Sequence, residues 1–153
     1  MTSLDQEVAL LRSVPFFSSI EGGKLKLLAY SSEKLGFEDG ETVFRQGSTD
    51  GDAYFILEGA AHVLAERNGH QVKVANLPQY ALFGEISAFC NIPRTATVQA
   101  RGHLVALRIP RDNFLNLIAE SPGVALQVIR VLARRVADTT SDLAAALDAR
   151  DRR

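Results

Sequence analysis

Glycines punctuate the middle of this chain at short intervals, and the segments between them are rich in Val, Ile, Phe, Tyr and Thr. The glycines in question are Gly36, Gly40, Gly47, Gly51, Gly59, Gly69, Gly84 and Gly102. This rhythm is typical of many short antiparallel strands joined by tight turns. Strands are expected at 42–44, 53–57, 60–65, 72–77, 95–100 and 104–109. The Asn68-Gly69 pair predicts a type I′ hairpin turn.

Helical periodicity stands on both sides of this region. Apolar residues recur at helical spacing over 4–13 and 24–35, and again over 111–119 and 123–148, after Pro110. The expected architecture is mainly β with flanking α. A single domain over 1–153 would hold N-terminal helices in 1–35 and a closed, jelly-roll-like antiparallel β-roll of about eight strands in 36–110. C-terminal helices would fill 111–148, the last of them long.

Composition narrows the class of protein. The chain has 153 residues, 46% of them hydrophobic, and a net charge of −1, which argues against broad attraction to nucleic acid or to a membrane surface. No apolar run is long enough to span a bilayer, and the N-terminus lacks the layout of a signal peptide. Cys90 is the sole cysteine and is expected to be a small buried residue. A cytoplasmic location is the expectation.

The segment 83–98 concentrates the residues that suit an anionic ligand. Gly84 lets backbone come close to a ligand because it has no Cβ. The five residues after it can begin a short helix whose first N–H groups are free, and Pro93 ends any helix before it. Arg94 adds a planar fork of donors that matches a phosphate. Together these features predict a site for a sugar phosphate that carries one negative charge.

Two runs in this segment, Phe83-Gly84-Glu85-Ile86-Ser87 and Arg94-Thr95-Ala96-Thr97-Val98, resemble the phosphate-binding cassette of cyclic-nucleotide-binding domains. The resemblance extends over about residues 10 to 147 and implies the β-roll fold of that family. It also implies a 3′,5′-cyclic nucleotide as ligand, with Arg94 on the cyclic phosphate and Glu85 accepting from the ribose 2′-hydroxyl. The amides of Gly84, Ile86 and Ser87 would face ribose or phosphate.

The base would be met by hydroxyl groups. Thr95 follows the arginine, and its hydroxyl can reach either a phosphate oxygen or the base. The run 133–140 resembles the central helix of catabolite activator proteins, which makes Thr139 and Thr140 candidates for contact with an adenine. Cyclic AMP is therefore preferred and cyclic GMP remains an alternative. Two alternatives remain open. Thr95 could simply be a β-branched residue at the start of a strand, and Thr139 and Thr140 could face solvent on their helix.

Four apolar residues are expected to line the roll near the nucleotide, although each could equally be plain core. They are Phe44, Val63, Val74 and Leu77. One departure from the family concerns residues 79–82, where a Gly-Asp pair often precedes the cassette. Because Tyr80 cannot take a positive φ as cheaply as glycine, the turn is expected to differ there.

The last predicted helix carries a heptad seam suited to a two-stranded coiled coil. The seam positions are Ala125, Ile129, Leu132, Val136, Thr139, Leu143 and Ala146. A homodimer through this helix is the expectation, and a helix laid on its own roll is the alternative. Arg134 and Arg135 are expected on a solvated face or in salt bridges.

No constellation for catalysis stands out. The three histidines lack metal-ligand spacing, so neither an enzyme, a metal site nor a cofactor is expected. The polar end after residue 148 is not expected to read DNA, and an unknown effector protein is expected to receive the signal. The alternatives are a nucleotide-independent interaction module of the same fold, or a sensor domain cut from a transcription factor or channel. Glu85 and Arg94 speak against the former, because a buried arginine without an anion is unfavourable.

Overall fold

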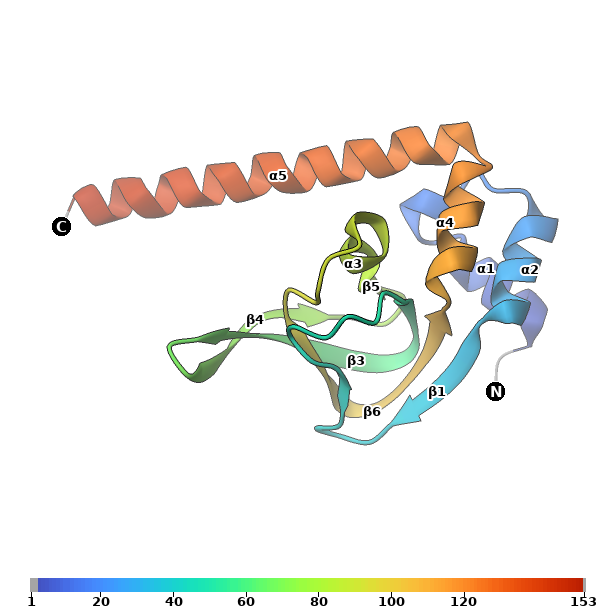
Figure 1. Cartoon of the computed structure of the whole chain (residues 1–153), viewed down its shortest axis with the longest axis horizontal. Coiled ribbons are helices and arrows are strands. Elements are labelled where there is room, and N and C mark those ends of the chain that lie inside the picture. Colours follow the sequence, from blue (N-terminus) through green and yellow to red (C-terminus); the bar gives the residue numbers. More distant parts are fainter. Residues whose placement is uncertain (1–2, 153) are drawn as a thin grey trace.

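A computed structural model describes residues 3–152 as an antiparallel β-structure with helices at one end and a long helix running past it (Figure 1). The elements in chain order are α1 (Leu4–Leu11), η1 (Pro15–Phe17), α2 (Gly22–Ser31), β1 (Glu33–Phe37), β2 (Thr42–Phe44), β3 (Ala53–Arg67), β4 (His70–Leu77), β5 (Leu82–Phe83), α3 (Glu85–Cys90), β6 (Thr97–Ile109), α4 (Arg111–Ala119) and α5 (Pro122–Asp151). The predicted class, mainly β with flanking helices, is confirmed.

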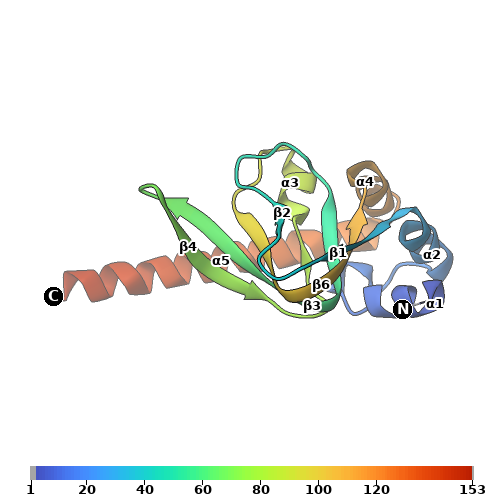
Figure 2. The same cartoon turned by 90° about the horizontal axis from the view of Figure 1, so that it is seen from below.

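The strands form one sheet in which β3 and β6 pair along most of their length. The order is β1-β6-β3-β4, with β2 also paired to β6 and β5 to β3, and the pairs are antiparallel. Figure 2 shows the sheet curling so that the β3–β4 hairpin extends away from α1, α2 and α4, in the direction in which α5 runs. The sheet has six strands over the described residues, so the prediction of about eight was wrong.

Glycine bulges explain the lower strand number. The segments expected as separate strands at 53–57 and 60–65 are one strand, β3, whose pairing with β6 shifts register on both sides of Glu58. Gly59 follows with φ +87°, and a Cβ there would lie 2.2 Å from the carbonyl oxygen of His103. In β6 the turn-like Gly102 has φ +67° within a continuous strand. Such bulges bend a strand without ending it.

The second helix is shorter than predicted. It was expected to reach residue 35, but α2 ends at Ser31 and β1 begins at Glu33. The hydroxyls of Ser31 and Ser32 donate to the carbonyl of Leu28 at 3.0 and 2.7 Å, and Ser32 is extended. Serine side chains compete in this way with the backbone ladder of a helix. Pairing of β1 with β6 then takes up the residues that follow.

Two apolar clusters hold the fold together. In one, the fully buried rings of Phe17, Phe55 and Phe114 join the helices to the sheet. The other fills the roll, where the rings of Tyr54 and Phe83 stack with centroids 5.3 Å apart. The predicted hairpin turn at Asn68-Gly69 is confirmed by positive φ values of 52° and 79°. The second cluster forms the floor against which the candidate site is built.

The helix α5 is 30 residues long, and its buried side chains lie only in its first third. Pro122 lies in its first turn, as predicted, and Val124 and Val128 are its buried residues. From Ala133 to Arg152 every residue is exposed, and Figure 1 shows the helix passing above α3 toward a distant C-terminal end. The helix therefore does not lie flat on its own roll.

None of the helices between residues 3 and 152 is by itself long and apolar enough to cross a membrane. Taken together, α4 and α5 meet that criterion by length and composition, but they are bent by 109° at their junction.

Candidate functional site

Gly84 is the tightest point of the cassette. It sits between β5 and α3 with φ +78°, and it caps the start of α3. A Cβ at this position would lie 2.8 Å from Nη1 of Arg94 and 3.1 Å from the carbonyl oxygen of Asp52. The glycine is thus required by both its dihedral angle and its close contacts. The first-turn N–H groups of α3, which have no partner within a helix, begin directly after it.

Arg94 is buried, with 2% of its surface exposed, and its guanidinium is held by the protein itself. Nε and Nη2 donate to the two carboxylate oxygens of Asp50 at 3.3 and 2.8 Å. Nη2 also donates to the carbonyl of Asp52 at 2.6 Å, and Nη1 to the carbonyl of Gly84 at 2.9 Å. These bonds use four of the five N–H donors of an arginine.

The charge of Arg94 is therefore balanced without a bound anion. Its guanidinium carbon also lies 3.9 Å from the ring centroid of Phe44, in a cation–π contact. The expectation that a buried arginine here would be unfavourable without an anion is wrong, because Asp50 supplies the counter-charge. Burial acts to raise the pKa of Asp50, but hydrogen bonds from Arg94 and Ser48 outweigh it and hold that pKa below its ordinary value.

Glu85, the first residue of α3, is 4% exposed and is joined to the long C-terminal helix. Its Oε1 accepts a hydrogen bond from Nη1 of Arg135 on α5, 50 positions later in the chain. The prediction that Arg135 belongs to a solvated face or a salt bridge is confirmed by this ion pair. This ion pair links α5 to the cassette through the carboxylate of Glu85.

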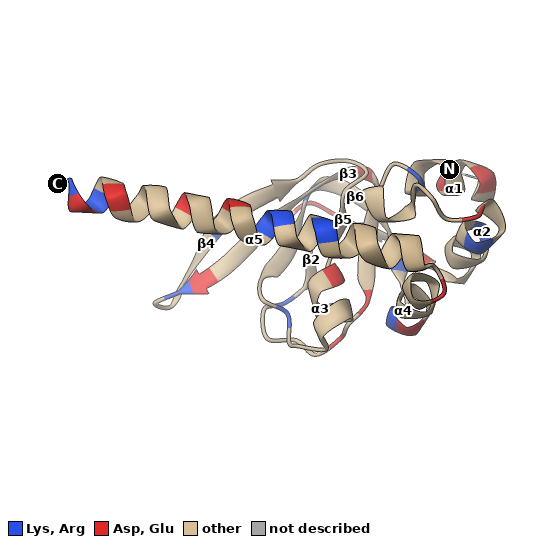
Figure 3. Cartoon of the chain, turned by 90° about the horizontal axis from the view of Figure 1, so that it is seen from above, with Lys and Arg blue, Asp and Glu red and all other residues tan. Residues whose placement is uncertain are grey.

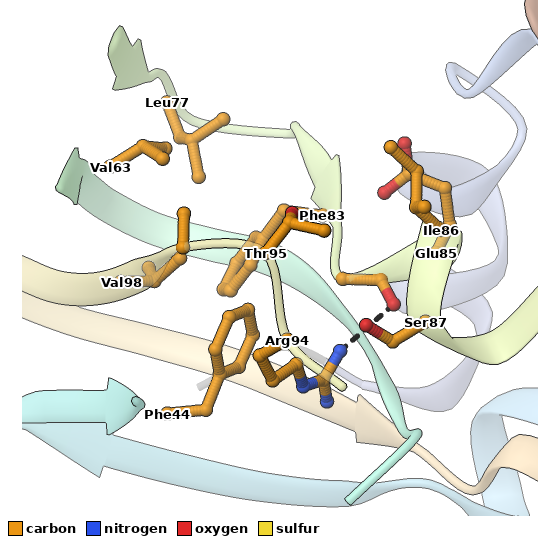
Figure 4. A pocket seen from close by; sticks show the side chains of 12 residues that line it. Phe44, Val63, Leu77, Phe83, Glu85, Ile86, Ser87, Arg94, Thr95 and Val98 are labelled. Carbon is orange, nitrogen blue, oxygen red and sulfur yellow. Dashed lines mark hydrogen bonds between the residues drawn. The ribbon is translucent and has the colours of Figure 1, made fainter. Parts of the chain in front are cut away.

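These residues meet at a cavity of about 110 Å³ on the open side of the roll. Its lining is Phe44, Val63, Leu77, Phe83, Gly84, Glu85, Ile86, Ser87, Arg94, Thr95, Ala96 and Val98. Figure 4 shows Val63 and Leu77 on one side, Glu85 and Ile86 on the other, and Arg94 between Phe44 and Ser87. Nine of the twelve predicted site residues thus come together in one place, from three strands (β2, β3 and β4), the helix α3 and the segments on either side of that helix.

Thr139 and Thr140 do not line that cavity. They line a second pocket of about 320 Å³ between α3 and α5, together with Ile86, Phe89, Cys90, Leu132, Arg135 and Val136. Ile86 belongs to both pockets, so the two spaces adjoin at this side chain. Contact between the threonines and a base stays a prediction. Cys90 is exposed here, so the expectation of a buried cysteine was wrong.

Val74 was predicted to line the roll and does not. It is 57% exposed, and the register of β3 with β4 explains why. Val63 pairs with Ala75, and the next residue, Leu64, pairs with Lys73, so Val74 is the extra residue of a bulge. A one-residue shift of register turns a side chain to the other face of a strand.

Tyr80 adopts a positive φ, although a tyrosine was expected to adopt one less readily than a glycine. Its φ is 69°, its N–H donates to the carbonyl of Ile56 at 2.9 Å, and its ring stacks on Phe55 with centroids 6.4 Å apart. The expectation that a tyrosine would force a different turn is wrong. A left-handed conformation costs a non-glycine residue about 1–2 kcal/mol, which these contacts offset.

Several residues of the site were not predicted. Phe83, Ala96 and Val98 line the cavity, and they flank predicted residues within the two quoted runs, so strand alternation offers a signal for them. Asp50 had no such signal, because it comes from the loop before β3 and reaches Arg94 from 44 positions away. Within residues 3–152 no group of three His, Cys, Asp or Glu side chains is placed to hold a metal ion.

A β-roll flanked by helices, with a buried arginine and a Gly-Glu turn at one cavity, is the arrangement of a domain that binds a small ligand. The profile of one family of such domains, described as the cyclic nucleotide-binding domain, matches residues 34–121. This is more than half of the chain, and the chain belongs to the cyclic nucleotide-binding domain family.

Individual relatives agree with this assignment. A cAMP-dependent protein kinase regulatory subunit from Mucor circinelloides f. lusitanicus is 37% identical over 121 residues, which are 78% of this chain and 27% of the relative. The regulatory domain of Toxoplasma gondii PKA, crystallised with cAMP, is similar with a TM-score of 0.74 and 21% identity over 88% of this chain and 50% of that one. The Thermus thermophilus catabolite activator protein also has a TM-score of 0.74, with 25% identity over 84% and 61%. The chain thus spans about a quarter of the kinase subunit.

Proposed function

We propose that this chain is a sensor that binds cyclic AMP in the roll and transmits binding through α5. The observation that carries the proposal is the shared cavity of Gly84, Glu85 and Arg94, with the arginine almost fully buried. Arg94 would hold the cyclic phosphate, together with amides of Gly84, Ile86 and Ser87. Glu85 would accept the ribose 2′-hydroxyl, since a carboxylate is an acceptor and suits a hydroxyl donor.

Cyclic AMP is favoured over cyclic GMP by the position of two hydroxyls. Thr139 and Thr140 lie in the pocket that adjoins the cavity at Ile86, where a base that leaves the roll would arrive. Two relatives of the chain are described by their dependence on cAMP or their crystallisation with it. In our proposal the threonines meet the adenine, and Thr95 stays near the phosphate.

The conformational response would act through Arg135. Its ion pair with Glu85 makes the same carboxylate a partner of α5 and of a bound ribose. A nucleotide shifts the position of α5 only if its affinity differs between the two arrangements of the helix. The contacts of Glu85, Thr139 and Thr140 are the ones that would differ.

The proposed sensor acts as a homodimer, binds rather than transforms its ligand, and works in the cytoplasm. The seam residues Ile129, Val136 and Leu143 are 62%, 66% and 58% exposed, which is unfavourable for large apolar side chains on a lone helix. A second α5 packed on this seam would bury them. The effector protein that receives the signal is outside this chain.

Titration calorimetry with cyclic AMP and cyclic GMP tests the proposal. Cyclic AMP is expected to bind more tightly, and Arg94→Lys to weaken it at least about tenfold, because a lysine lacks the fork and loses about 1.5–3 kcal/mol of charge-assisted hydrogen bonding. Because lysine keeps a cation beside Asp50, the Arg94→Lys variant is expected to stay folded. Its thermal unfolding serves as the control for this. Undiminished binding by Arg94→Lys and Arg94→Ala would refute the assigned site.

A second function has support from one observation. Asp50, Asp52 and Gly84 give Arg94 hydrogen-bond acceptors and a counter-charge from within the protein, which is what a nucleotide-independent interaction module of this fold needs. The same titration separates the two functions. An unfolding temperature that does not respond to millimolar cyclic AMP or cyclic GMP favours the interaction module.

A further inference from the structure

A groove of about 370 Å³ lies where the N-terminal half of α5 passes the 3-10 turn η1. It is lined by Pro15, Gln127, Arg130, Val131, Arg134, Arg135 and Asp138. The chain has a net charge of only −1, yet three arginines fall within six positions here. Figure 3 shows these positive bands grouped along the middle of α5, while negative bands follow toward the C-terminal end.

Two of the three arginines have no counter-ion among residues 3–152. Arg130 and Arg134 stand one helical turn apart and are exposed. No ion pair or side-chain hydrogen bond joins either of them to another residue in the part of the chain that the structure describes. Asp138 lines the groove without pairing with them, and Arg135 is held by Glu85. Apart from the Arg135–Glu85 pair, the groove therefore holds two arginines against one aspartate and carries a net positive charge.

The arginines call for hydrogen-bond acceptors on a ligand, whereas Gln127 calls for a donor. Its Oε1 is buried and has no hydrogen-bond partner, and it is the one side-chain polar atom of residues 3–152 in that state. An unpaired buried acceptor is unfavourable, so a ligand that donates an N–H gains by meeting it. The last torsion of a glutamine is soft, which lets the amide turn into the groove. Pro15 and Val131 supply apolar walls.

We propose that this groove docks an acidic segment of a partner protein. Carboxylates of the segment pair with Arg130 and Arg134, and a backbone N–H donates to Gln127. A phosphate ion or a nucleic-acid backbone satisfies the arginines but offers no such donor. The segment thus fits the charge, the orphaned acceptor and the apolar walls at once.

The groove is separate from the proposed dimer seam. Successive residues of a helix are about 100° apart, so Gln127, Arg134 and Asp138 share a face that is turned away from Val136 and Leu143. A second copy on the seam leaves the groove open to a different protein. Arg135 lines the groove and also holds Glu85, so a docked segment acts on the helix that is tied to the nucleotide cavity. The inference rests on the proposed sensor role for its purpose, but docking is measurable without nucleotide.

Fluorescence anisotropy of the full chain with a labelled peptide of about ten residues, alternating glutamate and leucine, tests the groove. Charge reversal by Arg130→Glu with Arg134→Glu is expected to weaken binding about tenfold or more. Arg101→Glu with Arg150→Glu changes the net charge equally at exposed sites outside the groove, and is expected to alter binding less than about twofold. Gln127→Leu should weaken binding several-fold while keeping the side-chain volume.

Two results would overturn the docking proposal. Equal weakening in both double variants would mean that only the overall charge matters. Binding of a peptide with glutamine in place of glutamate, of inorganic phosphate or of duplex DNA as tight as that of the acidic peptide would remove the assigned chemistry. Calorimetry with cyclic AMP on the same variants separates this test from the proposed sensor function, since Arg130 and Arg134 do not line the nucleotide cavity.

Discussion

Nη2 of Arg94 lies 2.8 Å from Oδ2 of Asp50, and the two ends of this ion pair meet different surroundings. The arginine side chain is 1% exposed and that of the aspartate 40%. The cation is thus fixed inside the roll while its counter-ion faces solvent. An incoming anion meets an arginine that is already oriented and already neutralised.

Asp50→Asn is expected to lower the free energy of unfolding at pH 7 by about 1–2 kcal/mol, because Arg94 stays buried beside a neutral partner while the half-exposed site moderates the loss. The pKa of Asp50 is lower in the folded protein, since hydrogen bonds from Arg94 and Ser48 outweigh the effect of burial. Such a carboxyl stabilises the fold above its unfolded pKa and loses this contribution as the pH falls through the folded pKa. Denaturant unfolding should therefore show the two proteins converging below about pH 4.

The matched control is Asp142→Asn, at an exposed aspartate of α5 that forms no ion pair with any other residue of 3–152. It should change the free energy of unfolding at pH 7 by less than about 0.5 kcal/mol. A difference between wild type and Asp50→Asn that stays constant down to about pH 2 would show that the ion pair contributes nothing.

Gly84→Ala is expected to destabilise the cassette more than the same change at another left-handed glycine. A Cβ at Gly84 meets Nη1 of Arg94 at 2.8 Å, whereas a Cβ at Gly40, with φ +82°, meets nothing within 4 Å. Gly40→Ala therefore measures dihedral strain alone, about 1–2 kcal/mol. Thermal unfolding should place Gly84→Ala below Gly40→Ala, and calorimetry should show weaker cyclic nucleotide binding for the former only. Equal stability of the two variants would argue against a close approach at Gly84.

Arg135→Ala is expected to lower stability by about 1–3 kcal/mol, because it leaves the buried carboxylate of Glu85 without its partner. Hydrogen exchange should show faster opening of α3 and of the first half of α5, which the ion pair joins. Arg150→Ala removes the same side chain from an exposed position of the same helix and should change neither quantity. Matching exchange patterns in the two variants would mean that Glu85 does not restrain α5.

Leu143→Glu is expected to shift the proposed homodimer toward monomer at micromolar concentration. Leu143 lies on the seam, is 58% exposed and lines neither pocket near the cassette. Burying a leucine is worth about 1.5–3 kcal/mol, and two copies are lost per dimer. Sedimentation velocity reads the outcome, with Ala145→Glu on the opposite face of α5 as control. A wild type that sediments as a monomer throughout would contradict the dimer.

The parts of this site that could be predicted are those written in local sequence. Gly84, Glu85 and Arg94 could be placed together because a turn, a helix start and an arginine follow one another within a short run. The long final helix and its proline start followed from periodicity. These features are determined by residues that are close in the sequence, and they are present in the structure.

The parts that could not be predicted depend on pairing across the fold. The joining of 53–57 with 60–65 into β3 and the outward turn of Val74 are both set by register against another strand. Tyr80 adopts its positive φ because Phe55 and Ile56 hold it, which no local propensity contains. Asp50 reaches Arg94 only after β3 and the cassette have been brought together.

The ladder between β3 and β6 also sets the pace at which this protein can form. It joins Ala53 to Ile109 at one end and Leu64 to Thr97 at the other, so each of its rungs closes a long loop of chain. Closing each loop lowers the entropy of the chain, and this loss comes before the strand pairs that offset it have formed. Domains dominated by such pairings fold on the scale of milliseconds to seconds, whereas an isolated helix such as α5 forms in about a microsecond. The helix is thus expected to form and unfold many times before the roll to which it is anchored has folded.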